Sequence, residues 1–220
     1  MSTNLVDRLI KLDACAVSDA LDRQNITAAV LGLQALSTTR RIAGRAITVQ
    51  LGPADGRKTH RHLCTAAVEA GGPGDIIVVA NEGRLHVGAW GGLLSLAASV
   101  RKIEGVVIDG ACRDLDESRE MGLPVYARAG IAVTARSRIV EYDWNVPVAI
   151  AGVTVAPGDY VIADASGVLV IPSKDASQII AVAERIADKE RLMAADIRSG
   201  RSISTVMGTD YETLLERKEM

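Results

Sequence analysis

Hydrophobic residues recur at two spacings along the first 125 residues, and the alternation predicts a series of helices and strands. Helical spacing is found over residues 5–22, 59–70, 88–102 and 114–121. After the first of these helices, a loop with few periodic signals follows to about Arg40. Strands are predicted over residues 42–51, 75–80 and 105–109; the last two are apolar throughout, which is typical of strands covered on both faces. Strands alternating with helices predict an α/β fold with parallel pairing.

The pattern changes after residue 147. Two turn sequences, PGD at 157–159 and ASG at 165–167, separate short apolar segments, which predicts a β-meander over residues 148–172. A long helix follows from about Lys174 to Ser199, where Gly200 can end it, and a last short helix is predicted from Thr209. Because no linker rich in Pro or Ser divides the chain, we expect one domain over residues 1–205 and a tail over residues 206–220.

Composition excludes several classes of protein. The chain of 220 residues is 48% hydrophobic and 24% charged, as expected for a globular domain with a core. Its net charge of −2 and aromatic content of 3% provide neither a basic surface nor stacking side chains for nucleic acid. No apolar run is long enough to cross a membrane. The three widely spaced cysteines and the charged N-terminal residues predict a cytoplasmic protein.

Two segments carry candidate chemistry. The turn Trp90-Gly91-Gly92-Leu93-Leu94 opens a predicted helix, where backbone N–H groups and the helix dipole favour a small anion; the alternative is a tight turn with glycines for packing. Arg113 and Asp114 follow the buried strand 105–109, and ligands of α/β sheets bind beyond the carboxyl ends of strands. Arg113 offers a donor fork for a carboxylate or keto oxygen, and Asp114 a hard oxygen for Mg²⁺ or Mn²⁺. A surface ion pair is the alternative.

These segments resemble the RraA-like family, which includes the class II 4-hydroxy-4-methyl-2-oxoglutarate/4-carboxy-4-hydroxy-2-oxoadipate aldolases. The similar stretches occur in the family's order along nearly the whole chain: ACAVSDALDR (14–23), RHLCTAAVEAGGPGDIIVVANEG (61–83), WGGLL (90–94), GVVIDGACRD (105–114) and VAPGDYVIADASGVLVIP (155–172). The resemblance implies a three-layer α/β/α swivelling-type domain, assembled as a homotrimer or a homohexamer.

The resemblance also implies a reaction. A metal-dependent lyase of this type cleaves 4-hydroxy-2-oxo diacids to pyruvate and a second oxo acid, with oxaloacetate decarboxylation as a side activity. The substrate carboxylate would lie on the amides of Gly92, Leu93 and Leu94, a divalent Mg²⁺ or Mn²⁺ ion on Asp114, and the developing enolate on Arg113. Family aldolases carry an acidic residue at the position of Gly92; some members with Gly there have an acidic residue at the position of Glu117. The alternative function is a non-catalytic regulator of a partner such as a ribonuclease. Family members that inhibit ribonuclease E typically lack an Asp at the position of Asp114.

Three further groups of residues are weaker candidates. Family members often have His at the position of His60, but His60 and His62 do not share a helix face, so a surface or subunit-contact role is favoured. The pair Ser18-Asp19, in the first predicted helix, resembles a family hallmark and is expected to pack or cap. Arg57 and Lys58 could meet a distal substrate carboxylate or simply be solvated.

Glu190 interrupts the apolar stripe of the long C-terminal helix. It lies four residues after Ile186 and three before Met193, and a carboxylate in that position must be exposed, paired or close to a cation. The simple expectation is a solvated side chain. The resemblance implies a second one, that an acidic residue of this helix, Glu190 or else Asp188 or Glu184, reaches the Asp114 site of an adjacent subunit.

Overall fold

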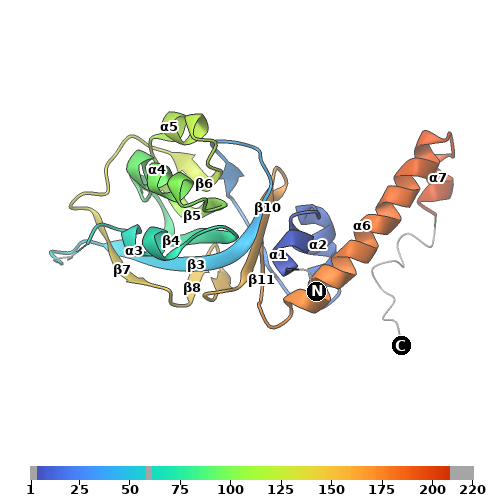
Figure 1. The fold of residues 1–220 in the computed structure, drawn as a ribbon, viewed down its shortest axis with the longest axis horizontal. Coiled ribbons are helices and arrows are strands. Elements are labelled where there is room, and N and C mark those ends of the chain that lie inside the picture. Colours follow the sequence, from blue (N-terminus) through green and yellow to red (C-terminus); the bar gives the residue numbers. More distant parts are fainter. Residues whose placement is uncertain (1–3, 58–60, 209–220) are drawn as a thin grey trace.

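A nine-stranded sheet forms the centre of the molecule (Figure 1), in a computed structural model that describes residues 4–57 and 61–208. Eight strands follow one another across the sheet, and the ninth, β7 (Ile139–Trp144), pairs with the far part of β3. The spatial order is β1 (Ala29–Val30), β11 (Gly167–Ile171), β10 (Tyr160–Asp164), β3 (Ile42–Pro53), β4 (Asp75–Gly88), β5 (Gly105–Cys112), β6 (Val125–Gly130) and β2 (Gln34–Ala35).

The four strands β3 to β6 are parallel and lie in chain order. A helix connects each to the next: α3 (Thr65–Ala70), α4 (Gly92–Val100) and α5 (Leu115–Glu120). Each crossover moves one strand further in the same direction, and because such crossovers are right-handed, all three helices lie on one face of the sheet. Their apolar side chains, such as Val68 and Leu94, pack there against Ile77, Val79 and Ile108.

A β-hairpin covers the other face. Its strands, β8 (Val148–Ile150) and β9 (Val153–Val155), form a sheet of their own and pack Ile150 and Val155 against Ile76, Val78 and Val107. The α/β class is therefore confirmed, with helices as one outer layer and this hairpin as the other. The predicted meander is divided between two sheets, because β10 and β11 pair with each other and with the main sheet.

A second group of helices packs beside β10 and β11. It consists of α1 (Leu5–Leu9), α2 (Ala14–Asp22) and α6 (Ala176–Arg198), which share a core with Ala43, Ile162 and Leu169. The buried residues of α6 end at Ala183. The rest of α6, followed by α7 (Ile203–Val206), extends away from the sheet (Figure 1). The predicted long C-terminal helix is confirmed, and no helix within the described residues is long and apolar enough to cross a membrane.

The structure differs from the predicted elements at their ends. The single helix expected over residues 5–22 is divided, because the Asp13 carboxylate accepts the N–H of Ala16 and starts a new helix. The helix expected from residue 59 begins at Thr65. The helix expected from residue 88 begins at Gly92, since β4 continues to Gly88. Strands β6 and β7 were not predicted. The short helix predicted from Thr209 and most of the expected tail lie outside the described residues, as do residues 58–60.

Candidate active site

The candidate site lies where β4 and β5 end side by side. Because the two strands are parallel neighbours, the segments that follow them meet at one edge of the sheet. The backbone joins them twice: the N–H of Ala89 donates to the carbonyl of Ala111, and the N–H of Arg113 donates to the carbonyl of Trp90 at 2.9 Å. The glycine turn and the Arg113-Asp114 pair, predicted separately, are therefore held against each other.

Asp114 is the centre of this contact. Its Oδ2 accepts the N–H of Gly92 at 2.9 Å, and both carboxylate oxygens lie 3.1 Å from Nε of Arg113. The residue has left-handed backbone angles, φ 57° and ψ 43°, just before α5. A non-glycine residue in this region is strained and persists only where its surroundings fix it, a condition common at functional sites.

Gly91 and Gly92 have no room for side chains. A Cβ atom on Gly91 would lie 2.9 Å from Oδ2 of Asp114, and one on Gly92 would lie 2.7 Å from Cδ of Glu117 and collide with its Oε2. The carboxylate of Glu117 thus occupies the space into which a side chain at position 92 would extend. An acidic group is present at this place although residue 92 is Gly.

The first turn of α4 is mostly buried, with only Leu93 exposed. Gly92, Leu93 and Leu94 form it, and first-turn N–H groups have no acceptor within their helix. The Gly92 amide donates to Asp114, while the Leu93 side chain is 85% exposed. The amides of Leu93 and Leu94 lie at the start of this helix, a position at which proteins commonly bind small anions.

The donor set fits a hard divalent cation. Asp114 and Glu117 both direct carboxylates at the Gly91-Gly92 backbone, and Mg²⁺ is usually held by one or two carboxylates together with water and substrate oxygens. Within residues 4–57 and 61–208, no three His, Cys, Asp or Glu side chains are grouped so that they could hold a metal ion. A divalent ion on these two carboxylates would need water or substrate oxygens to complete its coordination.

The sequence profile of the RraA-like family, described as Aldolase/RraA, matches residues 14–170. This chain belongs to the RraA-like family. Among its relatives, a Halalkalibacterium halodurans protein named "Putative 4-hydroxy-4-methyl-2-oxoglutarate aldolase" is 30% identical over 77% of this chain and 77% of its own length. The resemblance noted from the sequence is confirmed.

Two other similar proteins carry different names. Protein DlpA of Legionella pneumophila is 32% identical over 91% of this chain, but the chain spans only 32% of DlpA. The structure of RraAS2 from Streptomyces coelicolor, described as an unusual member of the RNase ES inhibitor RraA protein family, superimposes with a TM-score of 0.78 at 28% identity. That match covers 87% of this chain and 96% of RraAS2. Names within the family thus include both an aldolase and a ribonuclease inhibitor.

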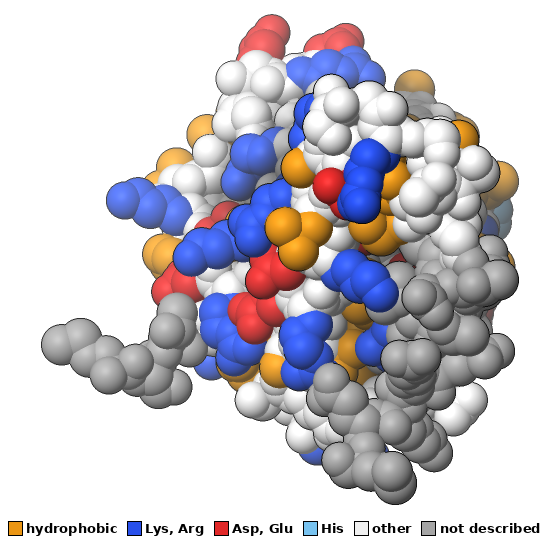
Figure 2. Space-filling model, turned by 90° about the vertical axis from the view of Figure 1, so that its right-hand side faces the viewer, with side chains coloured by type: hydrophobic (Ala, Val, Ile, Leu, Met, Phe, Trp, Pro, Cys, Tyr) orange, Lys and Arg blue, Asp and Glu red, His pale blue; other side chains and the backbone are white. Residues whose placement is uncertain are grey.

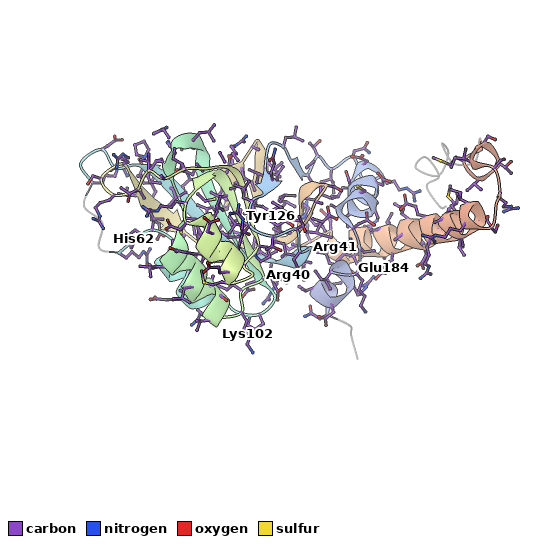
Figure 3. All side chains as sticks on the ribbon, turned by 90° about the horizontal axis from the view of Figure 1, so that it is seen from above. Arg40, Arg41, His62, Lys102, Tyr126 and Glu184 are labelled. Carbon is purple, nitrogen blue, oxygen red and sulfur yellow. The ribbon has the colours of Figure 1, made fainter. Side chains whose placement is uncertain are left out.

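The weaker candidates have other surroundings or lie outside the described residues. His60 is not among the described residues, and His62 is exposed at the end of the molecule opposite α6 (Figure 3). Arg57 lies over the Tyr142 ring, 4.3 Å from its centroid. Cys112, beside Arg113, is buried, which raises the pKa of its thiol to about 12, so it is no nucleophile at neutral pH.

Glu190 is not brought to the site of its own chain. It lies on the part of α6 that extends away from α4 and α5 (Figure 1). Partial burial raises the pKa of its carboxyl, and the nearby carboxylates of Asp13 and Asp19 raise it further. Glu190 and Asp19 therefore belong to one acidic surface between α2 and α6, which within one chain faces no Asp114.

The sequence did not predict a buried hydrogen-bond chain behind the site. The indole N–H of Trp90 donates to Oγ of Ser95, which lies 2.9 Å from Oγ of Ser118. The Oγ of Ser118 lies 3.2 Å from the carbonyl oxygen of Asp114. The only sequence signal is that a buried Trp needs an acceptor for its indole N–H.

Proposed function

We propose that this RraA-like protein is a divalent-metal-dependent lyase, a class II pyruvate aldolase acting on 4-hydroxy-2-oxo diacids. The observation that carries the proposal is the contact of Arg113 and Asp114 with the first turn of α4, with the Glu117 carboxylate beside it. The similarity to a relative named as an aldolase supports the same reaction class. The products would be pyruvate and a second oxo acid.

Each group has a separate task in this proposal. Asp114 and Glu117 would hold Mg²⁺ or Mn²⁺, which supplies Lewis-acid polarisation of the substrate. The amides of Leu93 and Leu94 bind the carboxylate next to the 2-oxo group. The Arg113 guanidinium stabilises the negative charge that develops on the 2-oxo oxygen when the electron pair of the C3–C4 bond stays with C3. Loss of CO₂ from oxaloacetate develops the same charge, so this side activity is also proposed.

Pyruvate release tests the proposal. A panel of 4-hydroxy-2-oxo diacids and oxaloacetate is incubated with the protein, and pyruvate is measured through NADH oxidation by lactate dehydrogenase. We expect release that EDTA abolishes and that excess Mg²⁺ or Mn²⁺ restores. Release that is indifferent to EDTA would overturn the metal mechanism.

A second candidate is a non-catalytic regulator of a protein partner such as a ribonuclease. Leu93, Leu96 and Val100 form an exposed apolar stripe on α4, and RraAS2 is named for a family of ribonuclease inhibitors. Inhibition of a purified RNase E-type ribonuclease, together with no pyruvate release from any member of the panel, would favour this function.

We further propose that the active unit is a homotrimer or homohexamer. The outer part of α6 and α7 expose Leu192, Ile197, Ile203 and Met207, and Figure 2 shows hydrophobic side chains among the charged ones at this end of the molecule. In such an assembly Glu190 of one subunit would border the Asp114 site of the next. A cytoplasmic location stays a prediction, supported by three free cysteines.

A further inference from the structure

Four groups behind the candidate site form a continuous hydrogen-bond chain. It runs from the Trp90 indole through Ser95 on α4 and Ser118 on α5 to the carbonyl of Asp114. Ser95 and Ser118 are fully buried, and Trp90 is 2% exposed. Because α4 and α5 supply one serine each, the chain crosses the contact between the two helices that begin at the candidate site.

The direction of the chain follows from counting hydrogens. The indole N–H is a donor only, so Ser95 Oγ accepts from it, and the carbonyl of Asp114 is an acceptor only, so Ser118 donates to it. A hydroxyl has one hydrogen, and Ser118 has used its own. Ser95 must therefore donate to Ser118, and all three hydrogen bonds point toward Asp114. Bonds aligned in this way polarise and strengthen one another in a buried environment.

The chain closes a ring around the site. Trp90 also accepts the N–H of Arg113 through its carbonyl, and Gly92, two residues later, donates its N–H to the carboxylate of Asp114. Both the backbone and the side chain of Asp114 are thus tied to the segment Trp90–Gly92. The left-handed backbone of Asp114 is the strained point of this ring, and the Ser118 hydroxyl holds its carbonyl.

We infer that Ser95 and Ser118 are positioning residues that fix the carboxylate of Asp114 for metal binding, acting through its backbone and not by contact with the metal. The inference rests on the proposed function, because it assigns these serines a role in the same site. It also makes Trp90 a reporter of that site, since the indole N–H shares the hydrogen-bond chain with Asp114.

Mn²⁺ alone is the probe, with free Mn²⁺ measured by electron paramagnetic resonance. We expect Ser118→Ala and Ser95→Ala each to weaken Mn²⁺ binding about tenfold, the lower end of the range for residues that orient metal ligands. The double variant should lose little more than either single one, because both break the same chain. Ser37→Ala is the matched control: Ser37 also bonds two partners, the carbonyl of Leu123 and the N–H of Val125, at the opposite end of the sheet. It should lower stability and leave Mn²⁺ affinity unchanged.

The ¹H–¹⁵N indole signals give a second measurement that does not depend on metal affinity. The protein has two tryptophans, Trp90 and Trp144, so the spectrum of Trp144→Phe shows which indole signal belongs to Trp90. Ser118→Ala should shift the Trp90 signal, although Trp90 is joined to Ser118 only through Ser95 in the hydrogen-bond chain. In the unsubstituted protein, added Mg²⁺ should shift the Trp90 signal and leave that of Trp144 in place.

The outcomes separate the two claims. Failure of the unsubstituted protein to bind Mn²⁺ would overturn the proposed function and this inference with it. Mn²⁺ affinity unchanged in both serine variants, with Mn²⁺ bound by the unsubstituted protein, would overturn the inference alone. If the variants do not fold, the unsubstituted protein provides the test: a Trp90 indole signal that does not shift when Mg²⁺ is added would overturn the inference.

Discussion

At the scale of single residues, both the carboxylate and the backbone carbonyl of Asp114 have hydrogen-bond partners. The carboxylate binds the Gly92 N–H and the Arg113 guanidinium, and the carbonyl accepts from the N–H and hydroxyl of Ser118. A substitution here therefore changes charge, helix capping or backbone geometry separately, according to the atom that it removes. Variants can be chosen to test one of these at a time.

Asp114→Asn and Arg113→Lys should both inactivate the protein while leaving it folded. An amide is a poor Mg²⁺ ligand, so Asp114→Asn should abolish metal binding and pyruvate release. Lysine keeps the charge of Arg113 without the two-pronged geometry, and we expect roughly a hundredfold lower turnover. Arg119→Lys is the control, because Arg119 pairs with the exposed Asp116 on the same helix. Near-normal turnover in either of the first two variants would contradict the assignment.

Glu117 and residue 92 should be interchangeable as sources of one carboxylate. Glu117→Ala is expected to weaken Mn²⁺ binding about tenfold. Gly92→Asp should also weaken it, because the new side chain collides with Glu117. Combining the two substitutions should recover affinity to within a few-fold of the unsubstituted protein. Calorimetric titration with Mn²⁺ measures this; losses that simply add would show that a carboxylate at residue 92 cannot replace that of Glu117.

At the scale of elements, α1 and α6 are joined by one ion pair of favourable geometry. Nε and Nη2 of Arg8 donate to the two carboxylate oxygens of Glu184 at 2.8 and 2.7 Å. Glu184 lies on α6 next to its last buried residue, Ala183 (Figure 3). The Arg8 hydrogen bonds lower the pKa of Glu184, and the positive charges of Arg8 and Lys11 add to the effect. The pair therefore fixes the N-terminal helix to the inner part of α6.

Glu184→Gln should lower the free energy of unfolding at pH 7 by up to about 1 kcal/mol, because the pair is partly exposed and screened. A carboxyl whose pKa is lowered on folding stabilises the protein above its unfolded pKa. The difference from the unsubstituted protein should therefore shrink below about pH 4.3 and vanish at lower pH. Urea unfolding at pH 7, 5 and 3.5 measures it. Asp188→Asn, which breaks an exposed pair within α6, should have a smaller effect.

The elements also show what the sequence could and could not predict. The strands at 75–80 and 105–109 were recognisable because their apolar runs are continuous. Strands β6 and β7 were not, because Arg128 and Glu141 interrupt their patterns and find partners far along the chain, in Asp109 and Arg61. The meeting of Arg113 and Asp114 with the glycine turn followed from parallel pairing. The place of Glu117 and the serine chain depend on how α4 crosses α5, which residue spacing does not encode.

At the scale of the whole molecule, the site and the exposed outer part of α6 lie at different ends (Figure 1). Isolated helices of this length are marginal in water, and apolar residues on a projecting helix gain stability by packing against another surface. A second copy of the chain would provide such a surface, in agreement with the proposed assembly.

Light scattering after size exclusion should give three or six times the mass of one chain. Replacing Leu192 and Ile197 by Asp should produce monomers with an unchanged helical circular dichroism signal and greatly reduced pyruvate release. Glu190→Gln should keep the assembly and lower turnover about tenfold. A structure of the assembly in which the Glu190 carboxylate lies more than about 10 Å from every Asp114, beyond one bridging water, would end the Glu190 proposal.

The order of strands β3 to β6 also bears on how the chain folds. Neighbours in this block pair over short separations, such as Arg45 with Asp75, whereas β1 and β11 join Ala29 to Leu169. Short loops close with less loss of entropy, so the block should form first. In pulsed hydrogen exchange during refolding, amides of β4 and β5 should become protected before those of β1 and β11. The segments that carry Gly92 and Asp114 would then meet before α6 is fixed, and a newly made subunit would possess its own part of the site before a neighbour adds Glu190.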